Sequence, residues 1–405
     1  MASFQPNAAQ TLAYAASVLF VGLFLKRRIA VLARLNIPAP VVGGLLAAAV
    51  ILVLRRNDIT FQFDGALAPI LMIAFFTSVG MNASFPLLKK GGVPVLVFWA
   101  MSTFLCFAQN FLGMGIAAAF GVNALVGVMA GSVTLVGGPA TGLAFAPKFQ
   151  ELGIAGADSL AIAAATFGIV CGGLLGGPVG TWIIERRLRR RALERSKLGA
   201  AATEEGEAGA TVTLEVERED APLLRNVLVL ALAMGIGAVV SEYIEARNIT
   251  LPAYIGAMLV ASVLRNLDDK FGWLRISMPV MDLVGNTCLL VYLAMALLNL
   301  KLWELAHLAA PLVMILVTQV IFMGLFARYV SFRLMGRDYE SAVMTGGLIG
   351  FALGTTANAL TNMRALVERY GPAPRAFLIV PLVGAFFIDF TNALIITAFL
   401  NWFRN

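Results

Sequence analysis

Long apolar runs set the strongest limit on how this chain can fold. A helix needs about 17 to 25 apolar residues to cross the hydrocarbon core of a bilayer. The runs that approach or reach this length are 10–25, 37–54, 65–83, 93–119, 159–184, 223–243, 251–264, 279–299, 305–331 and 376–402. Only 13% of the residues are charged and 60% are hydrophobic, whereas a soluble globular protein carries about 25% charged residues. The sequence therefore predicts an all-α polytopic membrane protein with ten full spans.

Charge and motif content exclude other classes of protein. The net charge of +7 is typical of membrane proteins with basic cytoplasmic loops, so the bilayer and not nucleic acid is the expected partner. Phosphate-binding, zinc-protease and nucleophile-elbow motifs are absent, and we expect no enzyme. The three cysteines, Cys106, Cys171 and Cys288, lie in apolar runs without metal-ligand spacing, which argues against a disulfide framework or a zinc site.

Two further apolar segments, 122–147 and 341–363, are interrupted near their middle by glycine and small hydroxyl residues. The interruptions read GSVTLVGGPATG (131–142) and GGLIGFALGTTANALTN (346–362). Positive charge in membrane proteins gathers on the cytoplasmic side. If each segment returns to the face from which it enters, the Lys and Arg residues left outside are Arg55, Arg56, Lys148, Arg247, Lys301 and Arg404. The sequence therefore predicts two re-entrant hairpins, two periplasmic termini and a charged cytoplasmic linker at 185–222.

The two halves of the chain, 1–184 and 223–405, repeat a common pattern. Pro40-Val-Val-Gly-Gly44 resembles Pro252-Ala-Tyr-Ile-Gly256, and Met129-Ala-Gly131 matches Met344-Thr-Gly346, a register that puts Thr141 opposite Thr356. Each half is predicted to hold five spans with its hairpin between the fourth and fifth. Because the first half starts outside and the second inside, the repeats are inverted, and we expect the hairpin tips to meet near the midplane.

Interrupted helices inside a membrane are typical of secondary transporters. Irregular backbone survives there only when it is buried in protein or lines a wet cavity. The N-terminal ends of broken helices suit an anionic substrate, and unwound carbonyls and C-terminal ends suit a sodium ion. The candidate substrate-binding residues are Ser132, Thr134, Gly137, Gly138, Thr141, Gly354, Thr355, Thr356 and Asn358.

A single carboxylate near the centre of a predicted span marks the candidate cation site. Asp389 lies in FFIDFTNAL, with Asn392 one turn away on the same helix face. A charged group at this depth is costly and usually functional. Asn358 and Asn362, one turn apart in the second hairpin, offer further carbonyl oxygens, so Asp389, Asn392, Asn358 and Asn362 are the candidate sodium ligands. A packing role for Asp389, hydrogen-bonded between helices, is the alternative.

Several long motifs resemble the bacterial sodium/glutamate symporters over nearly the whole chain except the linker. They are AFFTSVGMNA (74–83), GSVTLVGG (131–138), ATFGIVCGGLLGGPV (165–179), LAMALLNLKLWELA (293–306) and ERYGPAPRAFLIVPLVGAFFIDFTNALI (368–395). The resemblance implies sodium-driven uptake of glutamate by an inner-membrane homodimer with an elevator-type mechanism. Both hairpin tips depart from the family pattern: VGGPATG (136–142) replaces SGGHGTG, and GFALGTTANALTNM (350–363) replaces GFGLGATPTAIANM.

Two alternatives to glutamate symport remain at the level of sequence. Changes at the hairpin tips bear on substrate choice, so the same architecture could carry another small organic anion, such as a dicarboxylate or a 2-oxo acid. A cation/proton antiporter, in which Asp389 exchanges a proton for sodium, is the second alternative. Paired hydroxyl-rich hairpins argue against the antiporter, because it needs no site for an organic anion.

Overall fold

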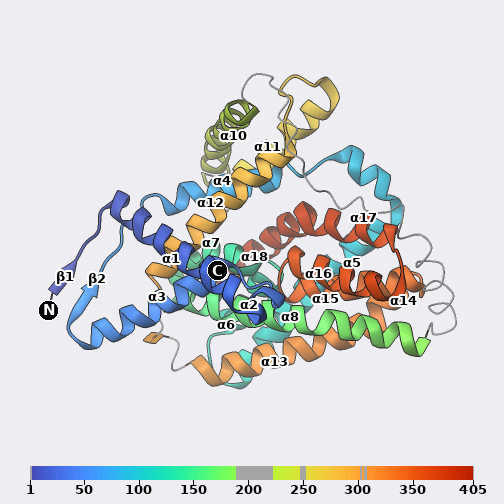
Figure 1. Ribbon diagram of the computed structural model, residues 1–405, viewed down its shortest axis with the longest axis horizontal. Coiled ribbons are helices and arrows are strands. Elements are labelled where there is room, and N and C mark those ends of the chain that lie inside the picture. Colours follow the sequence, from blue (N-terminus) through green and yellow to red (C-terminus); the bar gives the residue numbers. More distant parts are fainter. Residues whose placement is uncertain (1, 188–221, 247–251, 302, 305–307, 405) are drawn as a thin grey trace.

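The computed structural model describes residues 2–187, 222–246, 252–301, 303–304 and 308–404, and these residues are almost entirely helical (Figure 1). The first half contains α1 (Ala8–Arg28), α2 (Ala30–Arg34), α3 (Ala39–Arg56), α4 (Ala68–Gly80), α5 (Phe85–Ala119), α6 (Ala124–Val128), the π-turn η1 (Met129–Val133), α7 (Gly138–Glu151) and α8 (Ala157–Arg187). The second half contains α10 (Pro222–Glu245), α11 (Ala253–Phe271), α12 (Met278–Leu298), α13 (Ala309–Phe326), η3 (Ala327–Ser331), α14 (Phe332–Leu334), α15 (Tyr339–Leu353), α16 (Thr356–Tyr370), α17 (Pro374–Leu382), η4 (Val383–Phe387) and α18 (Ile388–Arg404).

Two details differ from the sequence prediction. The chain is not wholly helical, because β1 (Ala2–Phe4) and β2 (Ile59–Phe61) form a small parallel sheet. Helix α8 also continues through Arg187, so the first three residues of the predicted 185–222 linker belong to a helix. Glu185 fixes this helix end by accepting hydrogen bonds from Arg369 and Tyr370, both at 2.8 Å. The last residue of the predicted linker, Pro222, begins α10, and residues 188–221 lie outside the described residues.

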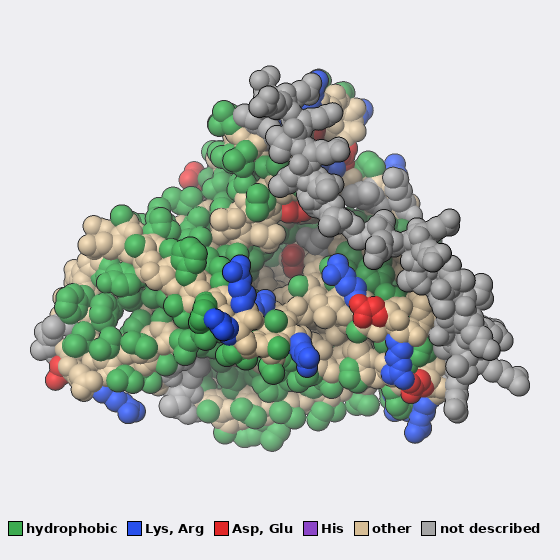
Figure 2. Space-filling model, in the orientation of Figure 1, with side chains coloured by type: hydrophobic (Ala, Val, Ile, Leu, Met, Phe, Trp, Pro, Cys, Tyr) green, Lys and Arg blue, Asp and Glu red, His purple; other side chains and the backbone are tan. Residues whose placement is uncertain are grey.

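Seven helices in the described ranges are long and apolar enough to cross a membrane: α1, α3, the part of α5 after Gly91, α8, α10, α12 and the α13–α14 unit. The exposed surface in Figure 2 is correspondingly rich in hydrophobic side chains. Three predicted spans have less regular counterparts. Helix α4 has 13 residues, α11 ends in a charged turn containing Asp268 and Asp269, and η4 interrupts the 376–402 run. The number of ten spans therefore stays a prediction.

The long helices form two packing groups. Helices α1, α3, α4, α10, α11 and α12 pack mainly on one another, and we call them the frame group. Helices α5 to α8 and α13 to α18, with their π-turns, pack around the largest buried apolar cluster and form the core group. Each group takes helices from both halves of the chain, so neither 1–184 nor 223–405 is a compact unit by itself.

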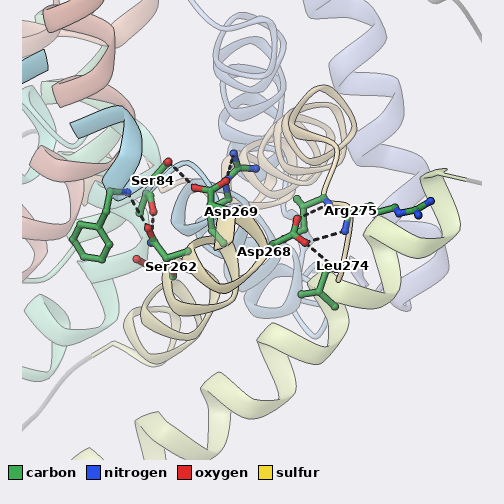
Figure 3. A network of polar contacts seen from close by, with 11 residues as sticks. Ser84, Ser262, Asp268, Asp269, Leu274 and Arg275 are labelled. Carbon is green, nitrogen blue, oxygen red and sulfur yellow. Dashed lines mark hydrogen bonds and ion pairs between the residues drawn. The ribbon is translucent and has the colours of Figure 1, made fainter. Parts of the chain in front are cut away.

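The connection from α4 to α5 joins the frame group to the core group, and polar contacts anchor it on α11. Asn266 donates to Ala83 O at 2.6 Å and accepts from the backbone N–H of Phe85 at 2.8 Å. Ser84 donates to Asp269, which also pairs with Arg265 at 2.9 Å (Figure 3). The joint between the two groups is therefore fixed at its frame end.

Asp268 stabilises the neighbouring turn after α11, also visible in Figure 3. Its carboxylate accepts hydrogen bonds from the backbone N–H groups of Leu274, Arg275 and Ile276, at 2.8 to 3.0 Å. Arg275 has a positive φ of 44°, a conformation that is uncommon outside glycine and needs such support. Asp268, at the charged end of α11, thus stabilises the turn that follows the helix.

Candidate functional site

The first interrupted segment enters and leaves at the same end of the molecule. Helix α6 starts shortly after α5 ends, and the chain leaves helical geometry at Gly131, inside η1. Helix α7 begins at Gly138, whose φ of 65° suits glycine. The far end of α7 returns to the C-terminal end of the chain, where Lys148 and Glu151 line one cleft with Arg404. Phe111, in the last part of α5, contacts Trp402 of α18, so the chain before and after this segment lies near the C-terminal end of α18.

The second interrupted segment is a helical hairpin. Helix α15 ends at Leu353, and Thr355 caps α16 by accepting from the backbone N–H of Asn358 at 3.4 Å. The two helices pack side by side, so closely that a methyl group added to Gly350 would lie 2.6 Å from Ala359 N. Their outer ends also meet, because the hydroxyl of Tyr339 donates to the carbonyl of Gly371.

Helix α8 brings the two breaks together. Its first half packs along α7, and its last turn lies beside the outer end of α16. At its middle, the carbonyl of Ile169 accepts from Asn358 Nδ2 at 2.8 Å, and the carbonyl of Gly172 accepts from Asn362 Nδ2 at 2.9 Å. The two segments thus approach the middle of α8 from opposite ends.

The breaks lie close to each other at their tips. A methyl group added to Gly138 would lie 3.7 Å from Gly354 O and 3.9 Å from Thr355 Cγ2. The N-termini of α7 and α16 and the C-terminus of α15 therefore gather at one place. Helix N-termini attract anions and helix C-termini attract cations, so this place can hold an anion beside a cation.

Several predicted site residues leave an oxygen unused there. Ser132, Asn358 and Asn392 are all fully buried, yet Ser132 Oγ, Asn358 Oδ1 and Asn392 Oδ1 have no hydrogen-bond partner among the described residues. Asn392 ties α18 to the first break by donating to Ser132 O at 2.9 Å. Buried polar atoms are nearly always paired, so unpaired oxygens at two breaks are suited to a ligand such as a sodium ion.

Other predicted residues use their polar groups inside the protein. Thr134 donates to Met129 O at 2.7 Å, and Thr356 donates to Gly384 O in η4 at 3.0 Å. Asn362 is buried against Gly172, as described above. Thr141 is buried, but it is the fourth residue of α7, whereas Thr356 is the first of α16. When the starts of α7 and α16 are aligned, the two threonines are three residues apart, whereas the sequence repeat puts them opposite each other. The reason is that the Met-x-Gly motif lies in the π-turn η1 in the first segment and inside α15 in the second.

Asp389 has a different environment from these asparagines. It stands in the first turn of α18, directly after η4. The side chain is partly exposed, and it makes no hydrogen bond or ion pair with any described residue. An interior carboxylate needs a compensating partner, so Asp389 remains the candidate for the charge that faces a bound cation.

The sequence prediction missed two features of the site. The sequence predicts a plain span over 376–402, but η4 breaks this run. Gly384 in η4 also accepts a hydrogen bond from Thr356, next to the second break. Gln109 and Asn110 in α5 were also missed, although both reach a break, as described below. The sequence feature that could have identified them is a pair of amide side chains inside the apolar run 93–119. Polar groups within a membrane span are costly, which is the argument that identified Asp389.

Comparison with known proteins places the chain in a family of membrane transporters. Residues 4–372 match the family described as "Sodium/glutamate symporter". The chain is 39% identical over 399 residues to the sodium/glutamate symporter of Escherichia coli (strain K12), covering 98% of both chains, and the same figures hold for the protein of Shigella flexneri. The sodium/glutamate symporter of Haemophilus influenzae is 39% identical over 386 residues, 95% of both chains. This chain belongs to the sodium/glutamate symporter family.

Proposed function

We propose that the chain is a secondary active transporter that couples sodium entry to glutamate uptake across the bacterial inner membrane. Its near-full-length relatives are named for this activity. The observation that carries the proposal is the close approach of the two breaks, where Gly138 lies near Gly354 and Thr355. Helix N-termini from both segments and unpaired buried oxygens meet there, which supports a site for an anion and a cation together.

The substrate carboxylates would bind at the N-termini of α7 and α16. The residues proposed to contact substrate are Ser132, Thr134, Gly137, Gly138, Thr141, Gly354, Thr355, Thr356 and Asn358. Sodium would be held by oxygen atoms of Asp389, Asn392, Asn358 and Asn362. Glutamate carries a net charge of −1, so uptake driven by the membrane potential needs at least two sodium ions. Each net charge moved then contributes about 2.3 kcal/mol per 100 mV.

The approach of the two segments to α8 from opposite ends supports a proposed membrane arrangement. We propose two inverted repeats with ten full spans, both interrupted segments re-entrant, both termini periplasmic and the 185–222 linker cytoplasmic. The division into a frame group and a core group supports an elevator-type motion of the core group, with the frame groups of a homodimer held fixed. The anchored joint at Ser84 and Asn266 is consistent with such a fixed frame.

Counterflow in proteoliposomes tests the proposed function. Vesicles containing the purified protein and loaded with unlabelled glutamate are diluted into labelled glutamate, with either sodium or choline outside. Sodium-dependent accumulation of label is expected. Competition by unlabelled dicarboxylates or 2-oxo acids tests the alternative substrates, and sodium–proton exchange without any organic solute would favour the antiporter. Absence of sodium-dependent counterflow would overturn the proposal.

A further inference from the structure

Two adjacent residues of α5, Gln109 and Asn110, each contact one of the two breaks. Gln109 Nε2 donates to Ala352 O at 3.0 Å, close to the end of α15. Asn110 Oδ1 accepts from the backbone N–H of Ser132 at 2.9 Å, inside η1. All four of these residues are fully buried. One turn of one helix therefore bridges the first and the second interrupted segments.

Both contacts replace hydrogen bonds that the breaks remove. The last carbonyl groups of a helix have no partner within it, and Ala352 is the second-last residue of α15. The N–H of Ser132 follows Gly131, where the backbone leaves helical geometry. Unpaired backbone groups are especially costly in a membrane protein. The two amide side chains thus stabilise the irregular backbone of both breaks from one side.

Each of the two side chains also has one polar atom without a hydrogen-bond partner among the described residues. Gln109 Oε1 and Asn110 Nδ2 are buried and have no partner among the described residues. A second buried glutamine, Gln319 of α13, donates to Gln109 O at 2.6 Å. This contact is to the backbone of α5 and involves neither amide side chain of the bridge. Because Gln109 and Asn110 are adjacent on one helix, a change in the backbone at one break must be accommodated by the pair or transmitted to the other break.

We infer that Gln109 and Asn110 are positioning residues that couple the two breaks, so that sodium and glutamate strengthen each other's binding. This inference rests on the proposed sodium-coupled symport. The two side chains touch backbone next to the breaks and need no contact with the ligands. If sodium fixes the backbone at one break, the bridge fixes the other break in the geometry that accepts glutamate. By linkage, glutamate then raises sodium affinity by the same factor.

The coupling factor is the quantity to measure. Binding of labelled glutamate to the purified full-length protein is titrated at low and at saturating sodium, and the ratio of the two dissociation constants gives the factor. Gln109→Met and Asn110→Leu keep the side-chain volume and remove the hydrogen bonds. We expect each variant to reduce the ratio by about fivefold or more. Gln319→Met is the matched control, since it removes a buried glutamine hydrogen bond that touches neither break, and its ratio should equal that of the unmodified protein.

The outcomes separate the inference from the proposed function. An unchanged ratio in Gln109→Met and Asn110→Leu, or an equal fall in Gln319→Met, would overturn the positioning role. If glutamate binding to the unmodified protein does not depend on sodium, the proposed function is refuted instead. If the apolar variants do not fold, Gln109→Asn and Asn110→Ser replace them, because each keeps a polar group but is too short to reach its partner. The same fall in the ratio is expected.

Discussion

At the scale of single residues, the free oxygens near the breaks and the carboxylate of Asp389 carry the proposed chemistry. No described residue neutralises Asp389, so a cation is the partner that would stabilise its charged form. Asp389→Asn keeps the shape of the side chain and removes the charge. We expect the half-saturating sodium concentration of transport to rise about tenfold or more, since hydrogen bonds and contacts to a charged group contribute about 1.5–3 kcal/mol. Sodium titration of uptake in proteoliposomes measures this value.

Asp282→Asn provides the control for this charge removal. Asp282 of α12 accepts a hydrogen bond at 3.3 Å from Asn82, in the connection that follows α4. Its replacement should leave the sodium dependence unchanged. The packing alternative for Asp389 makes a different prediction, namely lower stability of Asp389→Asn with normal activation by sodium. That result would remove Asp389 from the cation site and leave the asparagine oxygens as the ligands.

At the scale of elements, the bend in α5 determines how the frame group is joined to the core group. Gly92 interrupts this helix with a φ of 58° and a ψ of −154°, a combination open to glycine alone. Only Pro94 Cδ would lie within 4 Å of an added methyl group, at 3.9 Å, so backbone strain and not crowding decides the effect of a substitution. We expect Gly92→Ala to destabilise the protein by about 1–3 kcal/mol and to lower its melting temperature in detergent.

Gly115→Ala is the matched control in the same helix. Gly115 also has open space around it, but its backbone is helical, where alanine is favoured over glycine by about 1 kcal/mol. Its melting temperature should stay the same or rise. Equal melting temperatures for both variants would mean that the bend at Gly92 is not part of the stable fold.

The sequence predicted the elements that differ in composition from their surroundings. It missed the features that depend only on how the backbone folds. Both interrupted segments were predicted near 122–147 and 341–363, because glycine and small hydroxyl residues replace apolar ones there. The π-turn η4 was missed, since VGAFF has the composition of the apolar helix around it. The bridge formed by Gln109 was missed for a related reason: its partner is a backbone carbonyl in the other half of the chain, 243 positions away. Asn358 and Asn392 were predicted as site residues, but only the folded chain reveals that each keeps an unpaired oxygen.

At the scale of the whole molecule, the interleaving of the two halves explains how two segments far apart in sequence can share one site. The first segment is held by α5 and α8, and the second by α8 and α17. Both therefore depend on α8, whose middle carbonyls receive the side chains of Asn358 and Asn362. A motion of the core group as one body would keep this site intact while moving it past the frame group.

The proposed re-entrance of both segments predicts a labelling pattern that a full crossing cannot give. Single cysteines are placed at the exposed positions Phe120 and Ala155, which flank the first segment, and at Leu334 and Glu368, at the outer ends of the second. The native cysteines are first replaced by alanine. A membrane-impermeant maleimide should label the first pair in right-side-out vesicles and the second pair only in inside-out vesicles, because each segment returns to its own face. If either segment crossed the membrane, its two flanking positions would react from opposite sides. The inverted arrangement would then be wrong, and the close approach of Gly138 and Gly354 would need a different explanation.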